Sequence, residues 1–424
     1  MKKEKPENPT IFSEEIPTKP SKKRKKPRVI LLVFLCIALL LTAGLWIMTV
    51  IIYNDNFDQR FESYEPHMFL VSDFDGLERT KYEFTSDKGQ KLTGYLYRMR
   101  ADETSIDSET SAESDLSTDS ETSTDSETGA GSTTGADGLA GGESGDYRGI
   151  IIFAHGFGAG HNSYMDCADY FARNGYLVFA YDASGNDESE GIGKESSLGG
   201  IPQGVIDLDR AITFVEESGN FPDLPIGLFG HSWGGYSVCA VLTYHPEVKA
   251  VIECCGFNSS AAMFEAGGKD QAGSFIYAML PFVRLHERIK YGKYASNTAM
   301  KGFDASNAAV MIVHSEDDGV IPIEYGLDLF YEKYKDDPRF VFMRLENKGH
   351  SYVLNDRSYI NEFNTGFNEW LETLDYDYTE DKDRFAADKA DYIHENLDRE
   401  KWSNMLDKEM FEQFLEFYNE NIPG

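Results

Sequence analysis

A serine between glycines lies near the middle of the chain, in the segment 230–234, which reads GHSWG. A short apolar run at 225–229 predicts a buried strand before it, and the residues after it predict the start of a helix. At such a strand-to-helix turn, called a nucleophile elbow, the serine hydroxyl is held above the edge of the sheet. Side chains at Gly230 and Gly234 would collide with the neighbouring strand and helix. The segment therefore predicts that Ser232 is a nucleophile; the alternative is a glycine-rich turn without chemistry.

A serine hydroxyl is a poor nucleophile at neutral pH, so it needs a base within reach and an acid that orients the base. If the base comes after an acid that follows the strand predicted at 309–314, only two histidines remain, His350 and His394. His350 follows a turn that leaves the strand predicted at 340–345, whereas His394 lies in an acidic tail that is predicted to be helical. We therefore expect His350 to be the base.

Three neighbouring acids compete for the orienting role, namely Glu316, Asp317 and Asp318. They lie between a predicted strand and the proline that opens the next helix, Pro322. One or two of them could instead cap that helix, and we expect Asp317 to act in this way. The spacing alone leaves the choice of the catalytic acid open.

Backbone N–H groups must stabilise the negative charge that develops on the substrate oxygen. The amide of Trp233, directly after the serine, is one such donor. A second donor is expected from the loop after the strand predicted at 149–154, where Gly156 and Gly158 allow the backbone to approach a substrate closely. The alternative for this loop is a dinucleotide-binding turn, which would require glycine where His161 stands.

The elements that must position these residues follow one pattern from residue 148 onward. Continuous apolar strands alternate with helical segments, which predicts a mostly parallel sheet with helices on both faces. A hairpin is expected before this pattern, at 81–97. The alternation stops at 256–308, where large apolar side chains gather, so we expect a helical cap over the site. The other expected strands are 176–181 and 249–254.

These motifs resemble those of the α/β-hydrolase superfamily of serine hydrolases, of esterase or lipase type. The resemblance covers about 81–374 and rests on four segments: His155-Gly156-Phe157-Gly158, the GHSWG motif, Asp318 with Val320-Ile321-Pro322, and Gly349-His350. Ser232-Trp233-Gly234-Gly235-Tyr236 is also similar to prolyl-oligopeptidase-type serine peptidases, but the chain has no propeller repeats.

The resemblance implies an α/β-hydrolase fold and a triad in the family's order, Ser232, Asp318 and His350. The family's acid stands four residues before the proline, which implies Asp318. The oxyanion donors would be the amides of Phe157 and Trp233. Residues beyond 375 depart from the family pattern, so nothing is carried over to them.

The first residues of the chain predict a membrane anchor. Residues 1–28 carry a basic cluster that ends at Arg28, and residues 29–53 carry no charge. Such a run, at ~1.5 Å per residue, is long enough to cross a bilayer as a helix. The basic flank predicts a single-pass protein of the cell membrane with a cytoplasmic N-terminus and an extracytoplasmic catalytic domain. The alternative is a cleaved signal peptide, but the run is long and no Ala-x-Ala site follows it.

The remaining segments are defined by composition. Residues 54–80 are a polar and aromatic connector to the hydrolase domain, which we place at 81–374. Residues 101–147 contain no Lys or Arg and a tandem Ser-Thr-Asp-Ser-Glu-Thr repeat, which predicts a disordered acidic insertion; a stalk is the alternative. Residues 375–424 are an acidic, helical extension, expected to pack on the sheet domain or to bind a partner.

Net charge and cysteine usage exclude other classes. A formal charge of −32 over 424 residues argues against nucleic acid as a partner. The 5 cysteines have no metal-ligand spacing, so we expect buried, reduced thiols and no bound metal. The predicted chemistry requires no cofactor.

The sequence thus predicts a serine hydrolase that cleaves small, partly apolar esters through an acyl-enzyme. A serine peptidase or an acyltransferase would use the same triad. A catalytically inactive, anchored binding protein is a third hypothesis, but it would lack a triad member and none is missing here.

Overall fold

The computed structural model describes residues 26–100 and 147–423. Residues 1–25, which are most of the expected basic tail, lie outside this described part, and so do residues 101–146 of the expected acidic insertion. The chain divides into two compact units, residues 1–48 and 49–424. Helix α1, Lys26–Phe57, provides one described segment, Val29–Phe57, that is long and apolar enough to cross a membrane. It extends a few residues beyond the run expected from the sequence.

An eight-stranded sheet forms the centre of the second unit, in the order β1-β2-β4-β3-β5-β6-β7-β8. Strands β1 and β2 form the expected hairpin, and β2 pairs antiparallel with β4. The pairs from β4 through β8 are all parallel, so the predicted mostly parallel sheet is confirmed. The strands are β1 Leu77–Thr85, β2 Lys91–Met99, β3 Ile150–Ala154, β4 Leu177–Tyr181, β5 Ile226–His231, β6 Ala250–Cys254, β7 Ala309–Ser315 and β8 Phe340–Leu345.

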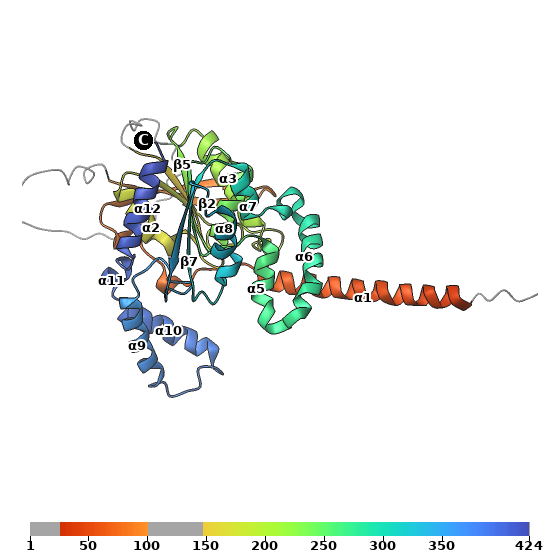
Figure 1. The fold of residues 1–424 in the computed structure, drawn as a ribbon. Helices are drawn as coiled ribbons and strands as arrows, with labels where there is room; N and C mark the ends of the chain where they lie inside the picture. Colours follow the sequence, from red (N-terminus) through yellow and green to blue (C-terminus); the bar gives the residue numbers. More distant parts are fainter. Residues whose placement is uncertain (1–25, 101–146, 424) are drawn as a thin grey trace, which may run out of the picture. The chain divides into compact units, whose positions relative to one another are not determined.

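Helices cover both faces of this sheet, with α2 and α12 on one side and α3, α7 and α8 on the other (Figure 1). Because both faces are covered, the central strands β3 to β6 are buried throughout, which explains their unbroken apolar runs. The helices of this unit are α2 Met165–Arg173, α3 Gln203–Glu217, α4 Trp233–Ala240, α5 Ser260–Ala272, α6 Ile276–Tyr291, α7 Ala299–Ala305, α8 Leu327–Tyr334, α9 Ser358–Leu371, α10 Lys382–Asn396, α11 Arg399–Ser403 and α12 Lys408–Asn421.

The C-terminal helix α12 completes the core. Phe229 of β5 packs against Phe171 of α2 and Phe414 of α12, and the ring centroids are 5.8 Å apart in both pairs. The hydroxyl of Tyr418 donates to the backbone oxygen of Leu228 at 2.6 Å. Of the two roles expected for residues 375–424, the structure therefore shows packing on the sheet domain.

Residues 256–308 form three helices rather than one cap. Helix α7 packs beside α4 and belongs to the layer that covers the sheet. Helices α5 and α6 pack on each other and on the end of α1, where the ring of Phe264 lies 6.3 Å from that of Phe57. The insertion is thus divided between the sheet layer and a projecting helical pair.

Candidate active site

The serine turn has the strained geometry that its sequence predicts. Ser232 joins β5 to α4 with a φ of 58°, in the left-handed region that L-residues rarely adopt. A Cβ on Gly230 would lie 2.4 Å from the backbone oxygen of Gly234, and one on Gly234 would lie 1.9 Å from that of Ala154. The backbones of α4 at Gly234 and of β3 at Ala154 are both fixed by packing, so positions 230 and 234 both require glycine.

The structure brings the three predicted catalytic residues together. His350 Nε2 lies 2.9 Å from the Oγ of Ser232, and His350 Nδ1 lies 2.7 Å from Oδ2 of Asp318. Each residue follows the carboxyl end of a parallel strand, since Ser232 comes after β5, Asp318 after β7 and His350 after β8. Strand ends at one edge of a sheet are neighbours in space, which explains why positions far apart in the sequence meet.

Asp318 is held in its ionised form. Its Oδ1 accepts hydrogen bonds from the backbone amides of Val320 and Ile321, each at 2.8 Å. Burial alone would raise the pKa of this carboxyl, but hydrogen bonds from His314 and His350, together with the electrostatic interaction with His350, hold the pKa well below its usual range. A charged Asp318 can keep the proton of His350 on Nδ1 and leave Nε2 free to accept the serine proton.

The other two acids of this loop have different roles. Oδ1 of Asp317 accepts from the hydroxyl of Ser315 and from the backbone amide of Gly349 at 3.0 Å. The expectation that Asp317 caps the next helix is therefore wrong, because its carboxylate turns toward the loop that carries His350. Glu316 forms an exposed ion pair with Arg344.

His231 is a site residue that the sequence reasoning missed. Its Nε2 lies 3.1 Å from the backbone oxygen of His350, and its Nδ1 lies 2.8 Å from the hydroxyl of Tyr164. A carbonyl only accepts, so Nε2 carries the proton and Nδ1 accepts from Tyr164. Burial, together with the electrostatic interaction with His350, lowers the pKa of His231 to about 3, so this imidazole is neutral.

Through His231 the two loops of the site are linked. The Tyr164 hydroxyl also accepts a hydrogen bond from the backbone amide of Gly156, at 3.2 Å. One line of hydrogen bonds thus runs from the loop after β3 through Tyr164 and His231 to the backbone of His350. A histidine directly before the serine of the elbow motif is the only signal in the sequence that points to this support.

The two proposed oxyanion donors lie beside the serine. Phe157 follows Gly156 in the loop after β3, and its ring lies 5.6 Å from that of Trp233. Within the described part of the chain, the backbone amides of Phe157 and Trp233 donate to no acceptor. Gly158, with a φ of 73°, makes the turn that the loop needs. Both amides are therefore free to bind a substrate oxygen.

His161 and His394, the two other histidines named in the sequence analysis, both have partners outside the site. His161 is fully buried, and its Nδ1 lies 2.8 Å from the carboxylate of Asp182, so this position supports the loop where a dinucleotide-binding turn would need glycine. His394, the rival base, lies exposed on α10, with Nε2 3.4 Å from Glu65.

A cavity of about 310 Å³ opens onto Ser232 and His350. Its further walls come from the connector, through His67 and Phe69, and from the C-terminal region, through Trp402 and Met405. No residue of 256–308, all of which are described, lines it. The expectation that this segment covers the site is therefore wrong; the connector and the C-terminal region occupy that side instead.

The cysteines are free thiols, and four of them are buried as expected. Cys36 is exposed, contrary to expectation, because it lies on the apolar helix α1 and not in the core.

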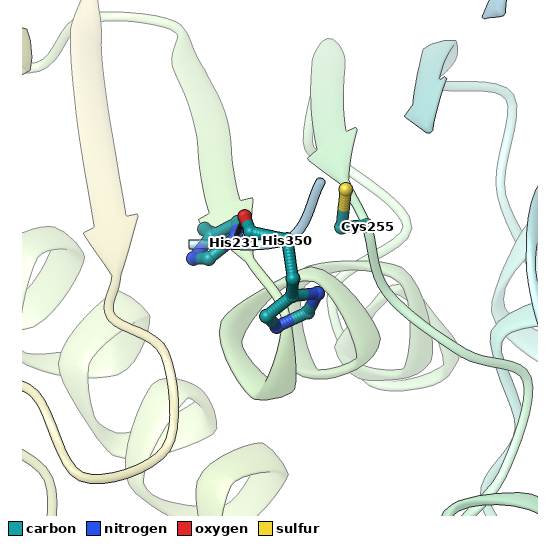
Figure 2. A group of neighbouring side chains, drawn as sticks. All are labelled: His231, Cys255 and His350. Atoms are coloured by element: carbon teal, nitrogen blue, oxygen red, sulfur yellow. Dashed lines mark hydrogen bonds between the residues drawn. The ribbon is translucent and has the colours of Figure 1, made fainter. Parts of the chain in front are cut away.

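One cysteine, Cys255, lies close to two site histidines. Potential ligand atoms of His231, Cys255 and His350 lie within 4.8 Å of one another, and Figure 2 shows that His231 and Cys255 come from neighbouring strand ends. The ring nitrogens of both histidines already have hydrogen-bond partners, and burial raises the pKa of the Cys255 thiol. The donor set fits a hydrogen-bonded catalytic site better than a metal centre.

Comparison with known proteins agrees with this architecture. Residues 145–293 match the family model described as serine aminopeptidase, S33. The chain has the α/β-hydrolase fold. The matched region includes Ser232 but ends before Asp318 and His350.

Two curated relatives are named as monoglyceride or monoacylglycerol lipases. The monoglyceride lipase of Rattus norvegicus is 33% identical over 92 residues, which is 22% of this chain and 29% of the relative. The monoacylglycerol lipase of Mycolicibacterium smegmatis is 32% identical over 108 residues, 25% of this chain and 37% of the relative. The chain thus matches less than two fifths of either relative. Among solved structures, an esterase of Pyrococcus furiosus, Pf2001, gives a TM-score of 0.44 at 14% identity, covering 72% of this chain and 94% of that one.

Proposed function

We propose that this protein is a serine hydrolase that cleaves carboxylic ester bonds through an acyl-enzyme intermediate. The observation that carries the proposal is the continuous line of hydrogen bonds from Asp318 through His350 to the hydroxyl of Ser232. The names of the curated relatives support an ester substrate.

The geometry supports the following reaction. The Oγ of Ser232 attacks the ester carbonyl carbon while Nε2 of His350 takes the hydroxyl proton. The amides of Phe157 and Trp233 stabilise the oxyanion. The imidazolium then gives its proton to the leaving alkoxide, and the C–O bond of the ester breaks. Water, deprotonated by His350, attacks the acyl-enzyme and releases the carboxylic acid and Ser232.

The cavity walls support a substrate that is partly apolar. Phe69, Trp402 and Met405 offer apolar surface beside the serine, while the carboxyl of Asp166 and the imidazole of His67 are polar groups on the same walls. A compact ester with an acyl or alkyl group and a hydroxyl-bearing part fits this combination.

Labelling with a fluorophosphonate probe tests the assignment, since such probes react with an activated serine. Ser232→Ala should abolish labelling of the full chain without lowering its melting temperature. Ser358→Ala, which removes an exposed serine hydroxyl at the start of α9, is the matched control and should label normally. Full labelling of the Ser232→Ala protein would refute the proposal.

A peptidase is the second candidate, because the matching family model is described as a serine aminopeptidase. An aminopeptidase needs an acid near the serine to bind the substrate ammonium group, and the cavity wall offers Asp166. Burial raises the pKa of Asp166 to about 7, so this carboxyl is half protonated at neutral pH and is a weak partner for a cation. Product analysis with p-nitrophenyl esters, aminoacyl p-nitroanilides and a competing alcohol separates esterase, peptidase and acyltransferase.

We also propose that α1 anchors the protein in a cell membrane as a single span, with a cytoplasmic N-terminus and the unit 49–424 outside. The basic residues before Val29 support this orientation. A membrane-impermeant amine reagent should label lysines of the second unit in intact cells, for example Lys333; labelling only after lysis would contradict this orientation.

A further inference from the structure

Helix α6 carries apolar side chains on two faces. Ile276, Met279, Leu280 and Val283 are buried against the rest of the unit. Leu285 and Ile289 are 45% and 67% exposed, and Phe275 and Tyr277, at the start of the helix, are 52% and 50% exposed. Large apolar side chains gathered on one exposed surface mark an interaction site more often than scattered ones do.

The same surface is basic in a very acidic chain. Between residues 271 and 303 the only acid is Glu287, which is buried, whereas five residues are basic. Two of these, Arg284 and Arg288, are exposed and one helical turn apart, and each directly precedes an exposed apolar residue, Leu285 or Ile289. Neither arginine forms an ion pair with any described residue. The exposed face of α6 is thus both apolar and cationic.

Chain connectivity keeps this helix near the end of the apolar segment. The ring of His286 on α6 lies 5.3 Å from that of Tyr53, and Glu287 accepts a hydrogen bond from the Tyr53 hydroxyl at 2.7 Å. Tyr53 follows residue 48 by five residues, so the chain between them spans at most ~18 Å. If residues 29–48 cross the hydrocarbon core, α6 must lie close to the headgroup region.

We propose that the exposed face formed by Phe275, Tyr277, Arg284, Leu285, Arg288 and Ile289 rests in the interface of a bilayer that contains anionic lipids. The proposal rests on the span proposed for α1. Apolar side chains beside arginines are the composition of helices that lie in the headgroup region, where the arginines meet lipid phosphates. This second contact would fix the orientation of the catalytic unit on the membrane, which a single span alone leaves free.

Lipid-borne quenchers test this contact on the full chain in nanodiscs. In a Cys36→Ser background the remaining cysteines are buried, so a fluorophore can be attached to one new thiol at a time. Ile289→Cys reports on the proposed face. Val341→Cys, on β8 and 43% exposed, is the matched control, and Leu40→Cys reports on the span.

We expect a nitroxide placed near the lipid headgroups to quench the fluorophore at 289 at least about threefold more than that at 341. Leu40→Cys should be quenched by a nitroxide deep in the acyl chains. Arg284→Glu with Arg288→Glu should remove most of the quenching at 289 in nanodiscs with anionic lipid, because the charge attraction is reversed.

Equal quenching at 289 and 341 while position 40 is quenched would overturn the contact and leave the span standing. No quenching at position 40 would overturn both. A shielded fluorophore at 289 that no lipid quencher reaches would show that a protein surface covers this face, which also overturns the proposal.

Discussion

The two sides of the cavity at Ser232 and His350 are built in different ways. On one side, Ser232, Asp318 and His350 follow the ends of parallel strands, and backbone turns hold them in place. On the other side, the walls come from the connector and from the C-terminal region, which lie more than 300 residues apart in the sequence. The chemistry is therefore determined by local turns on the sheet, whereas the shape of the cavity depends on how the ends of the unit pack.

The second side also reaches the catalytic loop. The ring of Phe157 lies 5.9 Å from that of Phe57, the last residue of α1, and 4.7 Å from that of Phe61 in the connector. The connector is held in turn by the tail, since the indole of Trp402 donates to the backbone oxygen of His67 at 3.1 Å. Segments outside the usual family pattern thus help to position a proposed oxyanion donor.

The largest effect is expected on the strand side, from Asp318→Asn. An amide cannot stabilise the imidazolium, and its NH2 group favours the wrong tautomer of His350, so kcat should fall by about 10³- to 10⁴-fold. The adjacent Asp317→Asn is the control: the amide oxygen can still accept from Gly349, so kcat should fall by less than about tenfold. Steady-state hydrolysis of a p-nitrophenyl ester measures both. Equal losses would mean that the loop, and not the ionised acid, governs the rate.

A smaller effect is expected on the connector side, from Phe61→Ala. Loss of the ring removes the support of Phe157, and a displaced oxyanion donor should lower kcat by about tenfold to a hundredfold, with KM changed less. Phe61→Leu should recover most of the rate. Phe385→Ala, which removes a partly buried ring from α10, is the matched control for general destabilisation. A change confined to KM would place Phe61 in substrate binding instead.

The same contrast explains what the sequence could predict. The strands, the glycines at 230 and 234, and the meeting of Ser232 with His350 depend on short patterns whose geometry is local or follows from parallel strand ends. The acid could not be chosen by spacing, because only the fold shows that Asp317 turns toward Gly349.

The cavity walls could not be predicted, because they depend on packing between distant segments. Trp402 and Met405 have the helical spacing and bulk of core residues, and nothing local distinguishes a residue that lines a cavity from one that fills the core. The apolar side chains of 256–308 were expected over the site for a similar reason. Their pattern predicts that they are buried, but it does not indicate which part of the protein they pack against.

The smallest effect is expected where the connector begins. Tyr53 is fully buried, and its hydroxyl and that of Ser260 both donate to the buried carboxyl of Glu287. A soluble fragment should therefore begin near residue 49, so that it includes Tyr53. Burial raises the pKa of Glu287 to about 7, although hydrogen bonds from Ser260 and Tyr53 oppose the shift. The folded protein therefore binds this proton more tightly than the unfolded chain does.

The stabilising effect of this proton is complete below pH ~4.5 and is lost as the pH rises through about 7. Glu287→Gln keeps the acceptor oxygen and cannot ionise, so its stability should not decline in this range. Between pH 5 and pH 8.5 the melting temperature of the unaltered protein should fall by about 3 °C relative to that of Glu287→Gln. A pH-independent difference between the two proteins would show that Glu287 is already charged in the folded state, and that its contact with Tyr53 is a charge-assisted hydrogen bond.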